Sequence, residues 1–138
     1  MNTILLLKFA ALTHVGLIAA GLLMPPTVHL WKHLRPLPDF IRKLFFVYYA
    51  FIGLCLAGFG IGTFLSAEEL VSGSPLARGI CWFLTVFWTG RLIAAVFVFD
   101  LRPYVTTRWR RLGLAMANTV FALLPVLYLT VALKRGTP

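Results

Sequence analysis

The sequence predicts an all-α, polytopic membrane protein: a four-transmembrane-helix bundle with a short interfacial helix between its first two spans. The composition is one reason, because 60% of the 138 residues are hydrophobic, 12% are charged and the mean hydropathy is +0.89, far more apolar than a soluble domain requires. The other is that the apolar residues form four runs, each near the roughly 20 residues that a helix needs to cross about 30 Å of hydrocarbon. We expect one integral membrane domain over residues 1–138, with helices near 2–24, 39–66, 75–99 and 108–133.

Local signals mark the ends of these helices. Asp39 would place a carboxylate in the first turn of the second helix, where the helix dipole favours it. Ser74 and Pro75 suit the N-cap and first position of the third helix, and Thr106 or Thr107 can cap the fourth. The first run is too long for the apolar core of a cleaved signal peptide and has no small-x-small cleavage site, so we expect it to remain as a helix.

Prolines delimit the segment between the first two spans. Pro25 and Pro26 are expected to stop the first helix, and Pro36 and Pro38 mark the far end of the segment. Between the two pairs, apolar and basic residues fall on opposite sides of a short helix, which predicts a segment lying in the headgroup layer. The connection over residues 66–75 is expected to be a short, turn-rich loop.

The net charge of +9 suits a membrane surface and not a nucleic acid, because the basic residues lie at helix ends. Loops 25–43 and 100–111 carry eight of them and the opposite side carries four. The positive-inside rule therefore places these loops in the cytoplasm and both termini outside it, as in a bacterial-type inner membrane. Membrane lipids are the expected partners. The residues expected to contact anionic headgroups are Lys32, Arg35, Arg108, Arg110 and Arg111.

Arg91 is the exception to this distribution, because it lies inside the third run, roughly 5 Å beyond its centre on the cytoplasmic side at 1.5 Å per residue. An arginine there costs at least about 2.5 kcal/mol on insertion scales. Asp100 is half a turn out of phase and about 13 Å further along the same helix, so it is expected to pair with Arg102, Arg42 or Lys43 instead. The partner of Arg91 would then be a backbone carbonyl, a headgroup, a ligand or another subunit.

Other polar side chains fall at a similar depth. His14, Arg91 and Asn118 come from different helices and lie within roughly 7 Å of depth of one another. Tyr49 follows in the second helix, and Trp88 shares the face of Arg91 at i−3, where an indole could stack on the guanidinium or on a ring-bearing ligand. These five residues form the candidate ligand-binding site. For His14 and Asn118 taken separately, we favour a purely structural role, in which their hydrogen bonds hold helices together for about 1 kcal/mol each. For Arg91 we favour a functional role, because a structural one does not require so costly a charge.

The remaining motifs are weak. His29 and His33 have the i, i+4 spacing of metal ligands, but no third ligand lies nearby, so we expect no metal site. Haem is disfavoured because no two histidines face each other at one depth. No cofactor is predicted, and quinone stays a candidate ligand. Gly58 and Gly62 form a GxxxG spacing, which we interpret as close packing within the bundle in preference to a dimer face.

The leading hypothesis is a non-catalytic membrane protein that binds a lipid, a quinone or a similar amphiphile, or serves as an accessory subunit of a membrane complex, through the polar cluster around Arg91. The alternative is a membrane-embedded enzyme acting on a lipid-soluble substrate, with His14 as acid–base group and Arg91 as electrophile. It requires His14 to face Arg91 across a cavity. A second alternative, a transporter or channel, needs a homo-oligomer because four short helices leave little room for an aqueous path.

Overall fold

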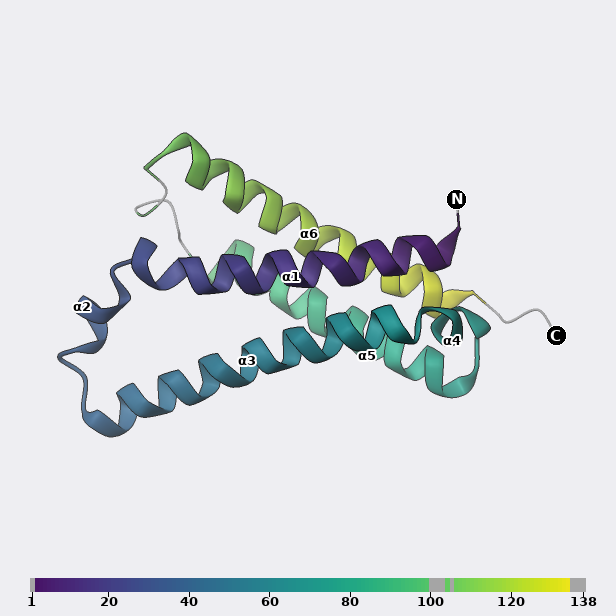
Figure 1. Ribbon diagram of the computed structural model, residues 1–138, viewed down its shortest axis with the longest axis horizontal. Coiled ribbons are helices and arrows are strands. Elements are labelled where there is room, and N and C mark those ends of the chain that lie inside the picture. The colour runs from purple at the N-terminus through teal and green to yellow at the C-terminus, as the bar shows by residue number, and fades with distance from the viewer. Residues whose placement is uncertain (1, 100–103, 105, 135–138) are drawn as a thin grey trace.

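The computed structural model describes residues 2–99, 104 and 106–134. All regular structure within these residues is helical, which confirms the all-α class (Figure 1). Four helices are long and apolar enough to cross a membrane, so the chain is an integral membrane protein built on the predicted four-helix bundle. The elements in chain order are α1 (Thr3–Thr27), α2 (Leu30–Leu34), α3 (Asp39–Leu65), α4 (Ala67–Ser72), α5 (Pro75–Ile93), the π-helix η1 (Ala94–Val98) and α6 (Arg108–Leu133).

The helix α1 runs through the two prolines that the sequence predicted would end it, and stops at Thr27. Proline lacks the N–H that would bond to the carbonyl four residues earlier, and for Pro25 that carbonyl belongs to Gly21. The hydroxyl of Tyr49 in α3 donates a hydrogen bond to this carbonyl oxygen instead. The predicted end was therefore wrong by about one turn, because a neighbouring helix supplies the missing donor.

The starts of the other spans follow the sequence signals closely. Asp39 is the first residue of α3 and Pro75 is the first residue of α5, as predicted. The Ser74 hydroxyl oxygen accepts a hydrogen bond from the Ala77 N–H at 3.3 Å, so the predicted cap is confirmed. Thr107 occupies the N-cap position of α6, but its side chain makes no capping hydrogen bond.

The two connections on either side of α3 each contain a short helix. The predicted interfacial helix is present as α2, and it follows a sharp turn at His29, whose φ of 51° is in the left-handed region that histidine tolerates better than most residues. The connection predicted to be a turn-rich loop folds instead as α4. This helix ends at Gly73, with a φ of 77° that favours glycine.

The third span changes its winding before it ends. At Ile93 the α-helix gives way to η1, where hydrogen bonds span five residues, and the Phe99 N–H bonds to the Ala94 carbonyl at 3.1 Å. The expected single α-helix over 75–99 is therefore wrong in its last turns. A constant step of 100° per residue does not hold beyond Ile93, so helical phase cannot be carried from Arg91 to the end of this span.

The spans pack as two pairs, α1 with α3 and α5 with α6, and α1 joins the pairs through contacts with α6 and α4. Figure 1 shows the helices close together at the α4 end and spread apart toward α2, where α3 and the start of α6 diverge from α1. We call the part from α4 to the layer of Trp88 the closed half, and the part from there to α2 the open half. Most of the buried core belongs to the closed half. The core comprises Leu7, Ala10, Leu17, Ala67, Leu70, Ala77, Cys81, Leu84, Trp88, Phe121, Leu124, Tyr128, Val131 and Ala132.

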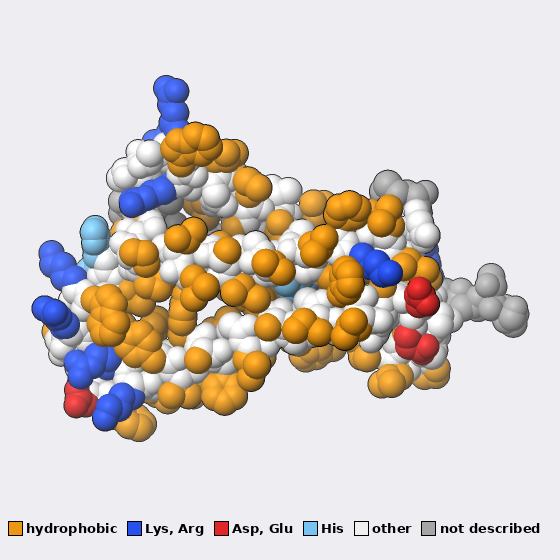
Figure 2. Space-filling model, viewed as in Figure 1, with side chains coloured by type: hydrophobic (Ala, Val, Ile, Leu, Met, Phe, Trp, Pro, Cys, Tyr) orange, Lys and Arg blue, Asp and Glu red, His pale blue; other side chains and the backbone are white. Residues whose placement is uncertain are grey.

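Charged side chains gather at the two ends of the molecule, and the surface between them is largely apolar (Figure 2). Basic residues surround α2 and the start of α6, whereas Glu68 and Glu69 lie on α4 at the opposite end. Between these ends many large apolar side chains are exposed, including Phe9, Phe51 and Phe83. This is the surface that a bundle crossing hydrocarbon must present to lipid.

Candidate functional site

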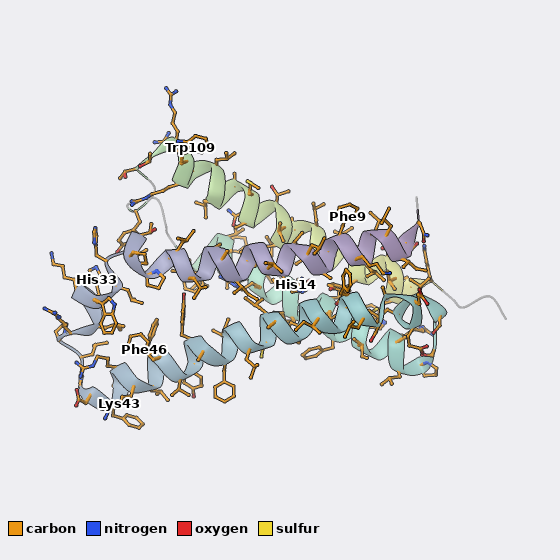
Figure 3. All side chains as sticks on the ribbon, in the orientation of Figure 1. Phe9, His14, His33, Lys43, Phe46 and Trp109 are labelled. Carbon is orange, nitrogen blue, oxygen red and sulfur yellow. The ribbon has the colours of Figure 1, made fainter. Side chains whose placement is uncertain are left out.

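Trp88 of α5 lies at the centre of the predicted polar cluster and is 1% exposed. Its ring meets His14 of α1 edge to face, with centroids 5.2 Å apart, and stacks on Phe121 of α6 at 5.9 Å. Figure 3 places His14 in the middle of the bundle, along the side where α1 faces α3. Trp88 therefore joins three spans at the boundary between the closed and open halves.

The guanidinium of Arg91 lies against two aromatic rings. Its Cζ atom is 4.8 Å from the ring centroid of Phe121 and 5.5 Å from that of Phe99. A desolvated cation over a ring gains about 2 kcal/mol, which is comparable with the insertion cost of at least about 2.5 kcal/mol for an arginine near the bilayer centre. Sequence reasoning missed these partners, because the π-helix before Phe99 and the placement of α6 carry no local signal.

Three nitrogens of this cluster are buried without a hydrogen-bond partner among the residues that the structure describes. The His14 Nδ1 atom lies 2.9 Å from the Ala10 carbonyl oxygen, which can only accept, so Nδ1 carries the proton and Nε2 of the neutral ring is an acceptor. The other two nitrogens, Trp88 Nε1 and Arg91 Nη1, are donors. Buried polar groups are normally paired, and an unpaired one costs about 1–3 kcal/mol.

His14 and Arg91 are linked through Trp88 and Phe121 and do not share a described cavity. The Cβ atom of His14 packs against Gly60 of α3: a Cβ added to Gly60 would lie 2.9 Å from it and 3.3 Å from the Ala11 carbonyl oxygen. His14 is therefore packed against a small residue on one side and an indole on the other, whereas the enzyme hypothesis requires it to face Arg91 across a cavity.

The two remaining candidate residues are Tyr49 and Asn118. Tyr49 donates its hydroxyl hydrogen to Gly21 and stacks on Phe45, with ring centroids 5.9 Å apart. Asn118 is half-buried, and its side chain forms no hydrogen bond with any residue the structure describes. The structure therefore brings His14, Trp88 and Arg91 into one connected cluster, and shows no contact of Tyr49 or Asn118 with it.

Two hollows lie beside these residues. A groove of about 430 Å³ runs between α1 and α3 and includes His14 in its wall. A cavity of about 270 Å³ lies in the open half, where α1 ends, beside α2 and η1. Phe99 lines the second cavity, and its ring also makes a cation–π contact with the Arg91 guanidinium. The full lining of this cavity is Met24, Val28, Leu30, His33, Val98, Phe99 and Tyr104.

The predicted headgroup contacts are all solvent-exposed in the structure: Lys32, Arg35, Arg108, Arg110 and Arg111. They lie at the end of the molecule where the basic side chains gather in Figure 2. Arg42 forms an ion pair with Asp39, its neighbour in the first turn of α3. The predicted pairing of Asp100 with Arg102 lies outside the described residues.

Sequence reasoning missed one polar contact and misread one motif. Thr63 and Tyr128 are both buried and share a hydrogen bond of 2.8 Å between their hydroxyl oxygens, which joins α3 to α6 in the closed half. The sequence signal that could have indicated this contact is the position of Tyr128 well inside an apolar span. Gly58 and Gly62 are exposed and an added Cβ would meet nothing within 4 Å, so the predicted packing of this GxxxG pair within the bundle is wrong. Gly60, between them, makes the close contact.

No group of three or more His, Cys, Asp or Glu side chains gathers as a metal site in the described part of the chain. The buried polar atoms that do gather are nitrogens of one histidine, one tryptophan and one arginine. Neither a protein-family model, nor a curated protein, nor a solved structure matches this chain.

Proposed function

We propose that this protein is a non-catalytic membrane protein that binds an amphiphile, such as a lipid or a quinone, in the open half of its bundle. The observation that carries the proposal is a set of three buried nitrogens, on His14, Trp88 and Arg91, that have no hydrogen-bond partner within residues 2–99, 104 and 106–134. The arginine among them carries a charge that a purely structural role does not require. A ligand that reaches these nitrogens would supply the missing hydrogen bonds.

The chemistry of the cluster selects the polar group of the ligand. Trp88 and Arg91 offer N–H donors, and Arg91 is also cationic, so a quinone carbonyl or a phosphate oxygen would suit them. The cavity of about 270 Å³ beside Phe99 has mostly apolar walls, as ligand sites usually have. Movement of the Phe99 ring would open this cavity toward the Arg91 guanidinium, against which that ring packs.

The proposal includes an orientation in the membrane. The basic end with α2 and the start of α6 would face the cytoplasm, and both termini would lie outside it, because basic residues are retained on the cytoplasmic side of bacterial-type inner membranes. Lys32, Arg35 and the arginines of α6 would then contact anionic headgroups at that surface. An amphiphile of the cytoplasmic leaflet would enter at the open half.

The test is the amount of amphiphile that copurifies with the protein. Wild type is expected to retain a lipid or quinone near one molecule per chain after detergent washing, and Arg91→Leu is expected to lose it. Arg78→Leu is the matched control, because Arg78 lies on the same helix at the opposite end and is exposed. Equal amounts of bound lipid and quinone in wild type, Arg91→Leu and Arg78→Leu would refute the proposal.

A second role, as an accessory subunit or a homo-oligomer, is favoured by the exposed face of α3. Of the four spans, α3 has the least buried apolar segment, and its Gly58 and Gly62 leave room for close approach of another helix. Cys55 lies one turn earlier and is exposed, so oxidative crosslinking would report a second copy on this face. A monomeric mass in mild detergent and in lipid would count against the oligomer.

A further inference from the structure

The groove between α1 and α3 is apolar and opens to the side of the bundle. Its volume of about 430 Å³ is within the range of ligand sites. Three small residues, Ala11, Ala57 and Gly60, give the groove its depth, and His14 contributes no exposed polar nitrogen to it, since its Nε2 atom is buried. The larger side chains around it are Leu12, Val15, Ile18, Leu56, Ile61, Phe64 and Leu65.

A hollow of this kind within hydrocarbon depth is filled by a chain of methylene groups. An empty groove would leave its walls without dispersion contacts, and water has no polar partner there. Because lipid tails are as apolar as the walls, filling alone confers no preference for one lipid over another. A preference needs a polar contact at one end of the groove.

Lys8 supplies such a contact. Its Nζ atom lies 5.8 Å from the ring centroid of Phe64, which forms part of the groove, at the end nearer α4. No acidic side chain among the described residues forms an ion pair with Lys8. Glu69, on neighbouring α4, accepts hydrogen bonds from the Ser72 and Ser74 hydroxyls instead.

We infer that this groove, with Lys8 at its end, binds one acyl chain of an anionic phospholipid whose phosphate contacts the Lys8 ammonium. Lysine extends its ammonium toward the headgroup layer while its methylene stem stays in apolar surroundings. The polar contact at Lys8 lies at the α4 end of the groove, whereas the groove wall further along shares His14 with the cluster around Arg91. Because the inference rests on Lys8 and on the apolar walls, it does not depend on the proposed function. Loss of one site is expected to leave the other intact.

Native mass spectrometry of delipidated protein with equal amounts of phosphatidylglycerol and phosphatidylcholine tests this inference. Wild type is expected to retain phosphatidylglycerol about fivefold over phosphatidylcholine, which corresponds to about 1 kcal/mol for one basic residue at a lipid surface. Lys8→Gln is expected to abolish the preference. Arg78→Gln, an exposed cation at the same end, is the control and should leave it unchanged.

Filling the groove is the second arm of the test. Ala57→Leu is expected to abolish retention of both lipids. Leu12→Trp should do the same from the groove edge, where Leu12 is 56% exposed and substitution leaves the helix contact intact. Retention that survives both variants would overturn the inference, as would equal losses from Lys8→Gln and Arg78→Gln. A dimeric mass that either groove-filling variant converts to a monomer would show a second copy in the groove, and would also overturn it.

Discussion

The closed and open halves of this bundle are built from the same four apolar spans, yet nearly all of the buried core lies in the closed half. On α1 the buried residues lie between Leu7 and Leu17, and on α6 between Phe121 and Ala132. Beyond Trp88 on the third span no residue is buried up to Phe99. Hydrophobicity therefore places all four helices in the membrane but does not decide where they pack against one another.

The two halves differ in the small residues and the hydrogen bonds at their helix contacts. The closed half has alanines, Cys81 and Gly60 at its contacts, which let backbones approach, and the Thr63–Tyr128 hydrogen bond joins α3 to α6 there. In the open half α1 and α3 are held by the bond from Tyr49 to Gly21. Contact between helices in lipid depends on such features, because apolar burial alone gains little there.

The largest loss of stability is expected from substitution of Trp88, at the boundary between the two halves. Trp88→Ala should lower the free energy of unfolding by about 3–5 kcal/mol, because it removes a fully buried ring that contacts two other spans, α1 and α6. Trp109→Ala is the matched control in the open half, where the side chain is 80% exposed, and should change it by less than about 0.5 kcal/mol. Unfolding in mixed micelles of increasing SDS content measures both. Similar losses for the two variants would contradict the division into halves.

Gly60 gives the next largest effect. Gly60→Ala should cost about 1–3 kcal/mol, because its Cβ would lie 2.9 Å from His14 Cβ and force α1 and α3 apart. Gly58→Ala meets open space and should stabilise the helix by up to about 1 kcal/mol. The same unfolding measurement compares them. If Gly58→Ala proved the more damaging change, the exposed GxxxG face would have to be packed in the membrane.

Tyr49 tests the link that holds the open half. Tyr49→Phe should cost about 1–2 kcal/mol, because it leaves the Gly21 carbonyl without the donor that replaces the missing Pro25 N–H. Tyr48→Phe serves as the control, since Tyr48 is 62% exposed. Hydrogen exchange of the α1 segment around Gly21 should rise only in Tyr49→Phe. Unchanged exchange there would show that the carbonyl has another partner.

The smallest effect is expected at the buried hydroxyl pair of the closed half. Tyr128→Phe should cost about 0.6 kcal/mol, typical of interhelical hydrogen bonds in membranes. Thr63 can then turn its hydroxyl to the carbonyl four residues earlier, as Thr85 does with Cys81. A double-mutant cycle of Tyr128→Phe with Thr63→Val isolates the coupling. A coupling energy near zero would show that the Thr63–Tyr128 hydrogen bond does not help to hold α3 and α6 together in the closed half.

Much of the fold could be predicted from the sequence because span length, caps and charge placement are local properties. Asp39, Ser74 and Pro75 each mark a helix start without reference to any other helix. The continuation of α1 past Pro25 could not be predicted, since its cause is the Tyr49 hydroxyl, which lies 28 positions after the Gly21 carbonyl that it bonds. The π-helix after Ile93 likewise has no local signal, because alanine and valine also occur widely in α-helices.

The candidate site could be predicted only in part. Helical phase predicted that Trp88 shares the face of Arg91, and rise along the axis predicted that His14 lies within roughly 7 Å of the depth of Arg91. In the structure the His14 ring contacts Trp88. The two rings that contact the Arg91 guanidinium belong to Phe121 of α6 and to Phe99, which follows the π-helix. Their positions depend on how the helices pack, so they could not be predicted from the sequence. Whether these residues bind a ligand stays a prediction.

Quenching of Trp88 fluorescence tests amphiphile binding most directly. In a variant with Trp31, Trp82 and Trp109 changed to Phe, Trp88 is the sole indole. A short-chain benzoquinone or a bromine-labelled phospholipid, titrated into delipidated protein, should quench it with a saturable dependence on concentration. Arg91→Leu should abolish the saturable component and Arg78→Leu should preserve it. Quenching that never saturates, or that is the same with Arg91→Leu, would contradict binding at the cluster.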